Sequence, residues 1–291
     1  MKKNRSDHCV TVIAYVIVVL AILVIVIPLL HIVAVSVSDG RSVTASKVQL
    51  IPKDIQFRAY AYVLQAGQFH LALINTIILT GLGSLISMML CTTAAYALAH
   101  IHLPGRKLLL LMYVFTMMFT GGIIPTFLLM TKLKLLNTYW SVIFVSCINV
   151  YNMLIIKNYF ERLPEEIEES ARIDGAGQLR IFAQISLPLA KPVLATVSLF
   201  FAVAFWNEYF NARLYLTTPS KITLQTYLRA IVFEASDPSG AFTYDTSKLF
   251  NVAPKTLVNA TVVSAMIPIC ILYPFLQKYF VSGMVLGSVK G

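Results

Sequence analysis

Acidic side chains gather in residues 158–190 of an otherwise apolar sequence, namely Glu161, Glu165, Glu166, Glu168, Glu169 and Asp174. Pro164 suits the first turn of a helix, where the N–H that proline lacks would have no partner. The glutamates that follow favour the positive end of the helix dipole, so a helix is expected to begin there. Gly175 predicts where this helix ends, because glycine readily adopts the left-handed conformation of a C-cap.

A second short helix is expected after a tight turn at Ala176–Gly177. Its apolar stripe consists of Leu179, Ile181, Phe182 and Ile185. Pro188 is expected to limit it, because proline disrupts the hydrogen bonding of a helix interior. The two helices would form a small structured unit against a membrane surface. A plain solvated loop explains the same residue types equally well.

A second cluster, of polar and aromatic residues, lies inside a long apolar run. It consists of Trp206, Asn207, Glu208, Tyr209 and Phe210, with Asn211 beside it. A charge at such depth costs about 2.5 to 3.5 kcal/mol on insertion scales, so it needs a partner or water. Aromatic faces beside amide and carboxylate groups could line a translocation cavity for sugars. An interfacial aromatic belt with an inter-helix hydrogen bond is the alternative.

Five further residues, in two groups, have polar or helix-breaking character inside apolar runs. Asn149 and Asn152 are candidates for the same substrate pathway, or for hydrogen bonds that only hold helices together. Gly121, Gly122 and Pro125 interrupt another run and predict a hinge or cavity wall, although a simple kink accounts for them as well.

Catalytic chemistry finds no support in the sequence. The four cysteines and five histidines are scattered, without the spacing of a metal site or a disulfide framework. No G-x-x-x-x-G-K-[ST] loop occurs, so the chain has no motif to hold the phosphates of ATP. Gly81 and Gly83 lie within an apolar run, where close helix packing is the expected role.

The composition of the whole chain predicts a membrane protein. The 291 residues are 58% hydrophobic and only 12% charged, with a mean hydropathy of +0.76, whereas soluble domains carry about 25% charged residues. A bilayer crossing needs roughly 20 apolar residues. The uncharged runs therefore predict an all-α protein with six spans, at Thr11–Ser38, His70–Ala99, Leu108–Met130, Thr138–Ile156, Pro192–Leu216 and Thr256–Gln277.

The net charge of +10 comes from short basic clusters between spans, which does not indicate nucleic acid. The basic N-terminus resembles a secretory signal, but the first apolar run exceeds the roughly 7 to 15 residues of a signal core, which favours a retained helix. Basic residues near span ends place residues 1–10 and the C-terminus in the cytoplasm. The transmembrane domain, 11–291, then has outer loops at 39–69 and 217–255 and an inner loop at 158–190.

The inner loop resembles the E-A-A-x3-G-x9-I-x-L-P loop of ABC importer permeases. The matching residues are Glu169, Ser170, Ala171, Gly175, Ile185, Leu187 and Pro188, with Ser170 in place of the first alanine. Segments that include Ile173-Asp174-Gly175-Ala176, Phe160–Pro164 and the tail from Tyr273 are similar to the carbohydrate branch of that family. Phe119-Thr120-Gly121-Gly122 is similar to a subgroup that imports polysaccharide fragments, uronic-acid oligomers included.

This resemblance implies an ABC type I importer permease fold with a cytoplasmic coupling helix, in the bacterial inner membrane. Glu169 would supply an acidic contact or a helix cap, Gly175 the turn, and Ile185 with Leu187 the packing onto the spans. Ser170, Ala171, Asp174 and Pro188 complete the expected coupling residues.

The resemblance also implies partners: a second homologous permease, two copies of an ATPase that bind ATP and Mg, and an extracytoplasmic sugar-binding protein. The chain itself would bind no cofactor. An importer of amino acids, peptides or phosphate is the first rival, which the carbohydrate-like tail disfavours. A membrane-embedded enzyme or receptor is the second, and it lacks a competent cluster of side chains.

Overall fold

The computed structural model describes residues 5–236 and 253–288, with side chains at 10–233 and 253–271. The expected N-terminal segment 1–10, the outer loop 217–255 and the tail each extend in part outside these residues. The described residues are helical, with no strand among them. They fall into two compact units, one within Met1–His70 and Leu228–Pro268 and one within Leu71–Tyr227 and Ile269–Gly291.

The first unit is built on α1 (Arg5–Ser36), α2 (Gly40–Thr44) and α3 (Arg58–Gln65). No residue of the most apolar window of α1 is buried, as expected for a helix that faces lipid. A small core of Ala34, Val35, Val43 and Val48 closes its C-terminal end. The Ser36 hydroxyl lies 2.7 Å from the Tyr60 hydroxyl, which links α1 to α3. The expected outer loop 39–69 thus contains two short helices.

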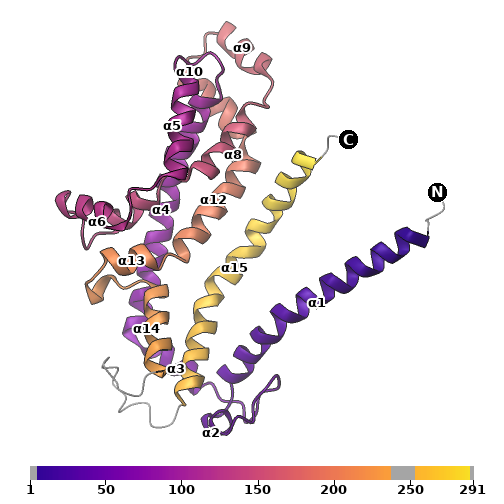
Figure 1. The fold of residues 1–291 in the computed structure, drawn as a ribbon, viewed down its shortest axis with the longest axis vertical. Helices are drawn as coiled ribbons and strands as arrows, with labels where there is room; N and C mark the ends of the chain where they lie inside the picture. Colours follow the sequence, from indigo (N-terminus) through magenta and orange to yellow (C-terminus); the bar gives the residue numbers. More distant parts are fainter. Residues whose placement is uncertain (1–4, 237–252, 289–291) are drawn as a thin grey trace. The chain divides into compact units, whose positions relative to one another are not determined.

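The second unit contains most of the spans. Its helices include α4 (Gly67–Ala99), α5 (Arg106–Met118), α6 (Ile123–Lys132), α7 (Tyr139–Ser146), α8 (Val150–Phe160), α12 (Lys191–Trp206) and α13 (Phe210–Tyr215). The residues of α14 (Leu224–Ser236) and α15 (Pro254–Ser288) are divided between the two units. Its core includes Leu79, Met153, Val197 and Phe201, all nearly inaccessible to solvent. Figure 1 shows α8 and α12 running alongside each other, in agreement with their direct contact.

Bends interrupt the apolar helices at three places in the described residues. α5 and α6 meet at 111° and α7 and α8 at 55°, which breaks the third and fourth predicted spans. The segment Gln178–Leu189 meets α12 at 81°, just before the fifth predicted span, which is interrupted between α12 and α13 instead. Within the described residues, each bent pair counted as one span gives up to six spans together with α1, α4 and α15. Figure 1 shows α6 turning away from the line of α5.

The interruption predicted from Gly121, Gly122 and Pro125 lies at the α5–α6 break, and the fourth and fifth predicted spans are interrupted as well, at residues 147–149 and 207–209. A glycine or a polar side chain lies at each of these three breaks. Gly122 has φ +85° just before α6. The Asn149 side chain accepts a hydrogen bond from the Asn152 N–H at 3.0 Å, which caps α8. Glu208 accepts from the Asn211 N–H at 2.9 Å at the start of α13.

The inner loop folds as two short helical segments, as predicted. α9 (Glu165–Ile173) begins directly after Pro164, and Gly175 follows it with φ +78°. The second segment consists of α10 (Gln178–Ile181), the π-helix η1 (Phe182–Ser186) and α11 (Leu187–Leu189). This second segment ends at Leu189, one residue after Pro188, close to where the proline was predicted to limit it.

Candidate functional site

The inner loop is fixed to α4 by the carboxylate of Glu168. Glu168 lies 3.0 Å from Nε2 of His100, which follows α4, and it accepts a hydrogen bond from the Ser186 hydroxyl at 3.0 Å. Arg172, one turn further along α9, adds a contact at 3.4 Å. The Glu168 side chain is only 18% exposed, so its charge needs these partners. One carboxylate therefore joins α9, η1 and the end of α4.

Tyr96 on α4 lies at the centre of the apolar side of this junction. Its ring packs edge-on against His100 and Phe160, at centroid distances of 4.7 and 5.4 Å, and against Phe182 at 4.7 Å. The Gln178 amide donates a hydrogen bond to the Tyr96 hydroxyl at 2.9 Å. α10 is thus also fastened to α4. A cavity of about 310 Å³ lies beside this junction, between α4 and α9.

A second ion cluster supports the end of α8. Lys157 is nearly buried and lies 2.7 Å from Glu161, and Arg106 contacts the same Glu161 carboxylate. Arg106 also donates to the Leu98 carbonyl at 2.8 Å, which links the start of α5 to α4. The segment that connects α8 to α9 therefore begins at a fixed position.

The residues of the E-A-A-like motif lie on the exposed side of α9. Glu169 and Ser170 are exposed, and the Ser170 hydroxyl bonds back to the Glu166 carbonyl at 2.7 Å. Glu169 lies in the middle of α9, so its alternative role as a helix cap is wrong. Asp174 is the C-cap residue. Ile173 and Leu179 are 86% and 84% exposed, which leaves two apolar side chains uncovered beside the acidic ones.

The packing residues of the second segment differ in part from those expected. Leu187 packs against the main core, as does Phe182, while Ile185 is only half-buried. Ile181 is fully buried. Pro188 is exposed. Ile181 was assigned to the apolar stripe, and the spacing of that stripe could have identified it as the main anchor.

The residues of the fifth-span group differ widely in exposure. Trp206 is 6% exposed and belongs to the core, whereas Phe210 is 54% exposed. Asn207 ends α12, and its side-chain oxygen accepts a hydrogen bond from Gln225 at 3.1 Å. Glu208 binds both the backbone and the amide of Asn211, at 2.9 and 3.1 Å. Tyr209 is half-buried at the N-cap of α13. These polar groups therefore stabilise the break between α12 and α13.

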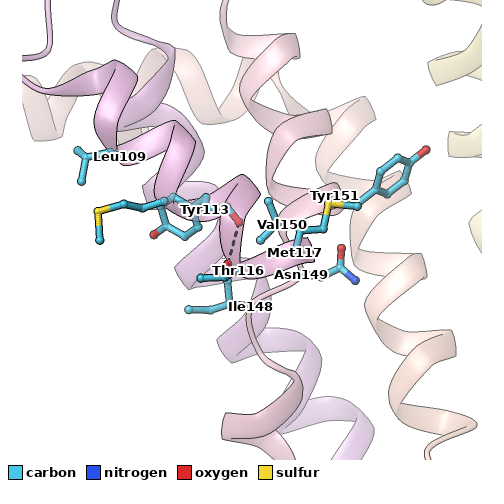
Figure 2. A pocket seen from close by; sticks show the side chains of 9 residues that line it. Leu109, Tyr113, Thr116, Met117, Ile148, Asn149, Val150 and Tyr151 are labelled. Carbon is cyan, nitrogen blue, oxygen red and sulfur yellow. Dashed lines mark hydrogen bonds between the residues drawn. The ribbon is translucent and has the colours of Figure 1, made fainter. Parts of the chain in front are cut away.

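Asn149 lines a groove of about 660 Å³ between α5 and the α7–α8 break, and Asn152 is buried behind it. Figure 2 shows this groove with Tyr113 and Thr116 on the α5 side and Asn149 on the other. Tyr151 also lines it, and its ring points away from Tyr113 (Figure 2). The groove is mostly apolar with a few hydroxyl and amide groups, a composition that suits ligand pockets.

The predicted hinge residues lie at the sharpest break. Gly122, at φ +85° and ψ 169°, precedes α6 in a conformation that only glycine adopts easily. Gly121 has open space around it. Pro125 lies in the first turn of α6, where its missing N–H costs nothing.

Two asparagines hold the opposite end of this unit: Asn75, which the sequence did not single out, and Asn137, whose segment Leu136-Asn137-Thr138 resembles the carbohydrate branch of the importer permeases. Asn137 has φ +58°, and its side-chain oxygen accepts hydrogen bonds from Thr217 and Thr218. Asn75 on α4 donates to the carbonyls of Ser220 and Ile222 at 3.0 and 2.9 Å. Their partners lie 80 residues or more away in sequence.

Apolar helices long enough to cross a membrane, several of them broken, and a structured acidic loop between them define a multi-pass membrane protein. Residues 97–285 match the family described as binding-protein-dependent transport system inner membrane component. The chain belongs to this family. It is a multi-pass inner-membrane permease subunit of an ABC transporter, and not an enzyme.

Known proteins similar to this chain cover nearly its whole length. The polygalacturonan/rhamnogalacturonan transport system permease protein YtcP of Bacillus subtilis (strain 168) is 41% identical over 267 residues, covering 91% of this chain and 92% of YtcP. A solved chain of a bacterial ABC transporter involved in the import of the acidic polysaccharide alginate has a TM-score of 0.88 and 36% identity to this chain. The match covers 95% of this chain and 98% of the solved chain.

A second solved chain shares the fold. It comes from a bacterial alginate ABC transporter in complex with an alginate pentasaccharide-bound periplasmic protein. Its TM-score is 0.60 at 14% identity, and the match covers 94% of this chain and 96% of the solved chain. The importer permease fold predicted from the inner loop is therefore confirmed.

Proposed function

We propose that this chain forms half of the translocation pathway of an importer for oligosaccharides or polysaccharide fragments, including acidic ones of the alginate or pectin type. The observation that carries the proposal is the similarity, over nine-tenths of the chain or more, to YtcP and to the alginate transporter chain. YtcP is named for the transport of polygalacturonan and rhamnogalacturonan, and the other transporter for the import of the acidic polysaccharide alginate.

The proposed assembly contains a second homologous permease, two copies of a cytoplasmic ATPase that bind ATP and Mg, and an extracytoplasmic sugar-binding protein. Both termini and the inner loop would face the cytoplasm. The periplasmic protein of the alginate complex supports an external partner of this kind.

In this assembly, the exposed side of α9 would contact the ATPase. Glu169 supplies charge there, and Ile173 and Leu179 supply apolar surface that is otherwise uncovered. Closure of the two ATPase copies on ATP would move α9, and with it the spans, so that the pathway opens outward. The remaining motif residues would shape this contact, with Ser170, Ala171 and Asp174 on α9 and Gly175, Ile185, Leu187 and Pro188 after it.

The sugar would pass between the breaks of the spans. Asn149 and Tyr113 in the groove, with Asn152 behind, offer an aromatic face and amide groups to a pyranose ring. Asn207, Glu208, Tyr209 and Phe210 would act at the α12–α13 break, with Trp206 as their buried support. Gly121, Gly122 and Pro125 would allow α6 to change its angle to α5.

The substrate class is tested by ATP hydrolysis of the purified complex with its binding protein, against neutral maltose-type and anionic uronate oligosaccharides. We expect the uronate set to stimulate hydrolysis. Stimulation by the neutral set alone would overturn the acidic substrate, and a response to neither would overturn the sugar class.

The role of the inner loop is tested by Glu169→Lys. Reversal of this exposed charge should lower sugar-stimulated ATP hydrolysis about tenfold, the scale of one charge-assisted contact. The affinity of the binding protein for free sugar should not change, which serves as the control. Unaltered stimulation would exclude Glu169 from the ATPase contact.

A further inference from the structure

We propose that Glu168 is a positioning residue that transmits the movement of α9 to α4, separately from the ATPase contact assigned to its neighbour Glu169. This inference rests on the proposed coupling role of the inner loop. It assigns different tasks to two adjacent glutamates.

The two side chains have different surroundings. Glu169 is exposed, and within the described part of the chain no hydrogen bond to its carboxylate is found. Glu168 is turned inward, with His100 and Ser186 each at 3.0 Å. The Ser186 hydroxyl belongs to a residue that is 1% exposed, so it is fixed inside the protein. Glu168 thus faces the spans, and Glu169 faces outward.

The partners of Glu168 are themselves held in place. The other ring nitrogen of His100 lies 2.9 Å from the Tyr96 carbonyl, and its ring packs on the Tyr96 ring. Gln178 also contacts His100, at 3.2 Å. The imidazole therefore has little freedom to follow α9 unless the end of α4 moves with it.

α9 and α4 are not neighbours along the polypeptide chain. α9 is joined covalently to α8 through residues 161–164 and to α10 through residues 174–177. The contact between Glu168 and His100 spans 68 residues of sequence. This contact is partly open to solvent, with side-chain exposures of 18% for Glu168 and 29% for His100, so solvent screens its contribution to stability. Its position across two helices makes it suited to transmission rather than to stability.

The experiment uses the complete importer, reconstituted with its binding protein, and measures sugar transported per ATP hydrolysed. Glu168→Gln keeps the size of the side chain and removes its charge. We expect it to assemble normally, as judged by co-purification of the ATPase, to continue hydrolysing ATP, and to transport about threefold to tenfold less sugar per ATP, the scale of a lost charge-assisted hydrogen bond. His100→Gln breaks the contact from the other side and should give the same ratio.

Glu169→Gln is the matched control. It should lower ATP hydrolysis and transport together, at an unchanged ratio. If Glu169→Gln has no effect, the proposed function of the loop fails whatever Glu168 does. If Glu169→Gln acts as expected while Glu168→Gln keeps the ratio of the unaltered protein, only the present inference fails. A double variant of His100 and Glu168 that is worse than either single variant would also contradict a shared link.

A distance measurement separates transmission from simple support. Spin labels at Ile173→Cys on α9 and His102→Cys after α4, both exposed, report on the two helices once the four native cysteines are replaced by serine. With Glu168 intact, ATP binding should leave this distance narrowly distributed. With Glu168→Gln the distribution should broaden on ATP binding. Identical distributions in both proteins would overturn the proposal.

Discussion

Gly175 holds the turn between α9 and α10 in the left-handed conformation, with φ +78°. We expect Gly175→Ala to destabilise this turn by about 1 kcal/mol, because an L side chain is strained at positive φ. The measurement is hydrogen exchange of the α9 amides, which should become faster.

Gly177, two residues further on, provides the matched control. It also has open space around it, but its φ is −73°, which any residue adopts. Gly177→Ala should leave the exchange of α9 unchanged. If both variants accelerate the hydrogen exchange of the α9 amides equally, the positive φ of Gly175 is not what sets the stability of the turn.

Residue types alone predicted part of this site. Gly175 and the acidic first turn of α9 follow from local rules of helix capping, and both are confirmed. The environment of Glu168 could not be predicted, because His100 and Ser186 are brought to it only by the fold. The polar fifth-span residues were assigned to a substrate pathway, whereas their hydrogen bonds also cap two helix ends.

At the scale of helices, the contact between α4 and α12 depends on Gly83. A Cβ atom at this position would lie 2.8 Å from the Phe205 ring, closer than van der Waals contact allows. We expect Gly83→Ala to destabilise the protein by about 1 to 3 kcal/mol through overpacking. The measurement is the thermal unfolding of the purified permease in detergent.

Gly81 lies on the same helix and has nothing within 4 Å of its Cβ position. Gly81→Ala should therefore be neutral or slightly stabilising, since alanine favours a helix by about 1 kcal/mol over glycine. A loss of stability as large as that of Gly83→Ala would show that helix packing against Phe205 is not the cause.

The spans were predictable from uncharged runs, since membrane length and backbone hydrogen bonding constrain them strongly. The breaks within them were not, apart from the one at Gly121 and Gly122. Asn149 and Glu208 lie before the first turns of α8 and α13 and accept hydrogen bonds there, and such single polar residues hardly change the apolar composition of the run. The end of the second inner-loop segment was predictable from Pro188, because the segment stops one residue later, at Leu189.

At the scale of the whole molecule, the number of spans predicts which loops share a side of the membrane. Ile51, between α2 and α3, is 77% exposed, and Ile173 on α9 is 86% exposed. In a background without the native cysteines, Ile51→Cys should react with an impermeant maleimide in intact spheroplasts. Ile173→Cys should react only after permeabilisation. The reverse pattern would invert the proposed orientation and place the inner loop outside.

A π-helical turn contains more residues than an α-helical turn, and η1 is such a turn between α10 and α11. Four α-helical residues turn the chain by about 400°, and the five residues of a π turn rotate it by nearly the same total because each of them turns less. Deleting one residue from Phe182–Ser186 and restoring α geometry would therefore leave α11 and α12 in nearly the same angular register. Buried positions such as Val193 and Val197 would remain buried. Natural variants of this segment should therefore include some that are shorter by one residue.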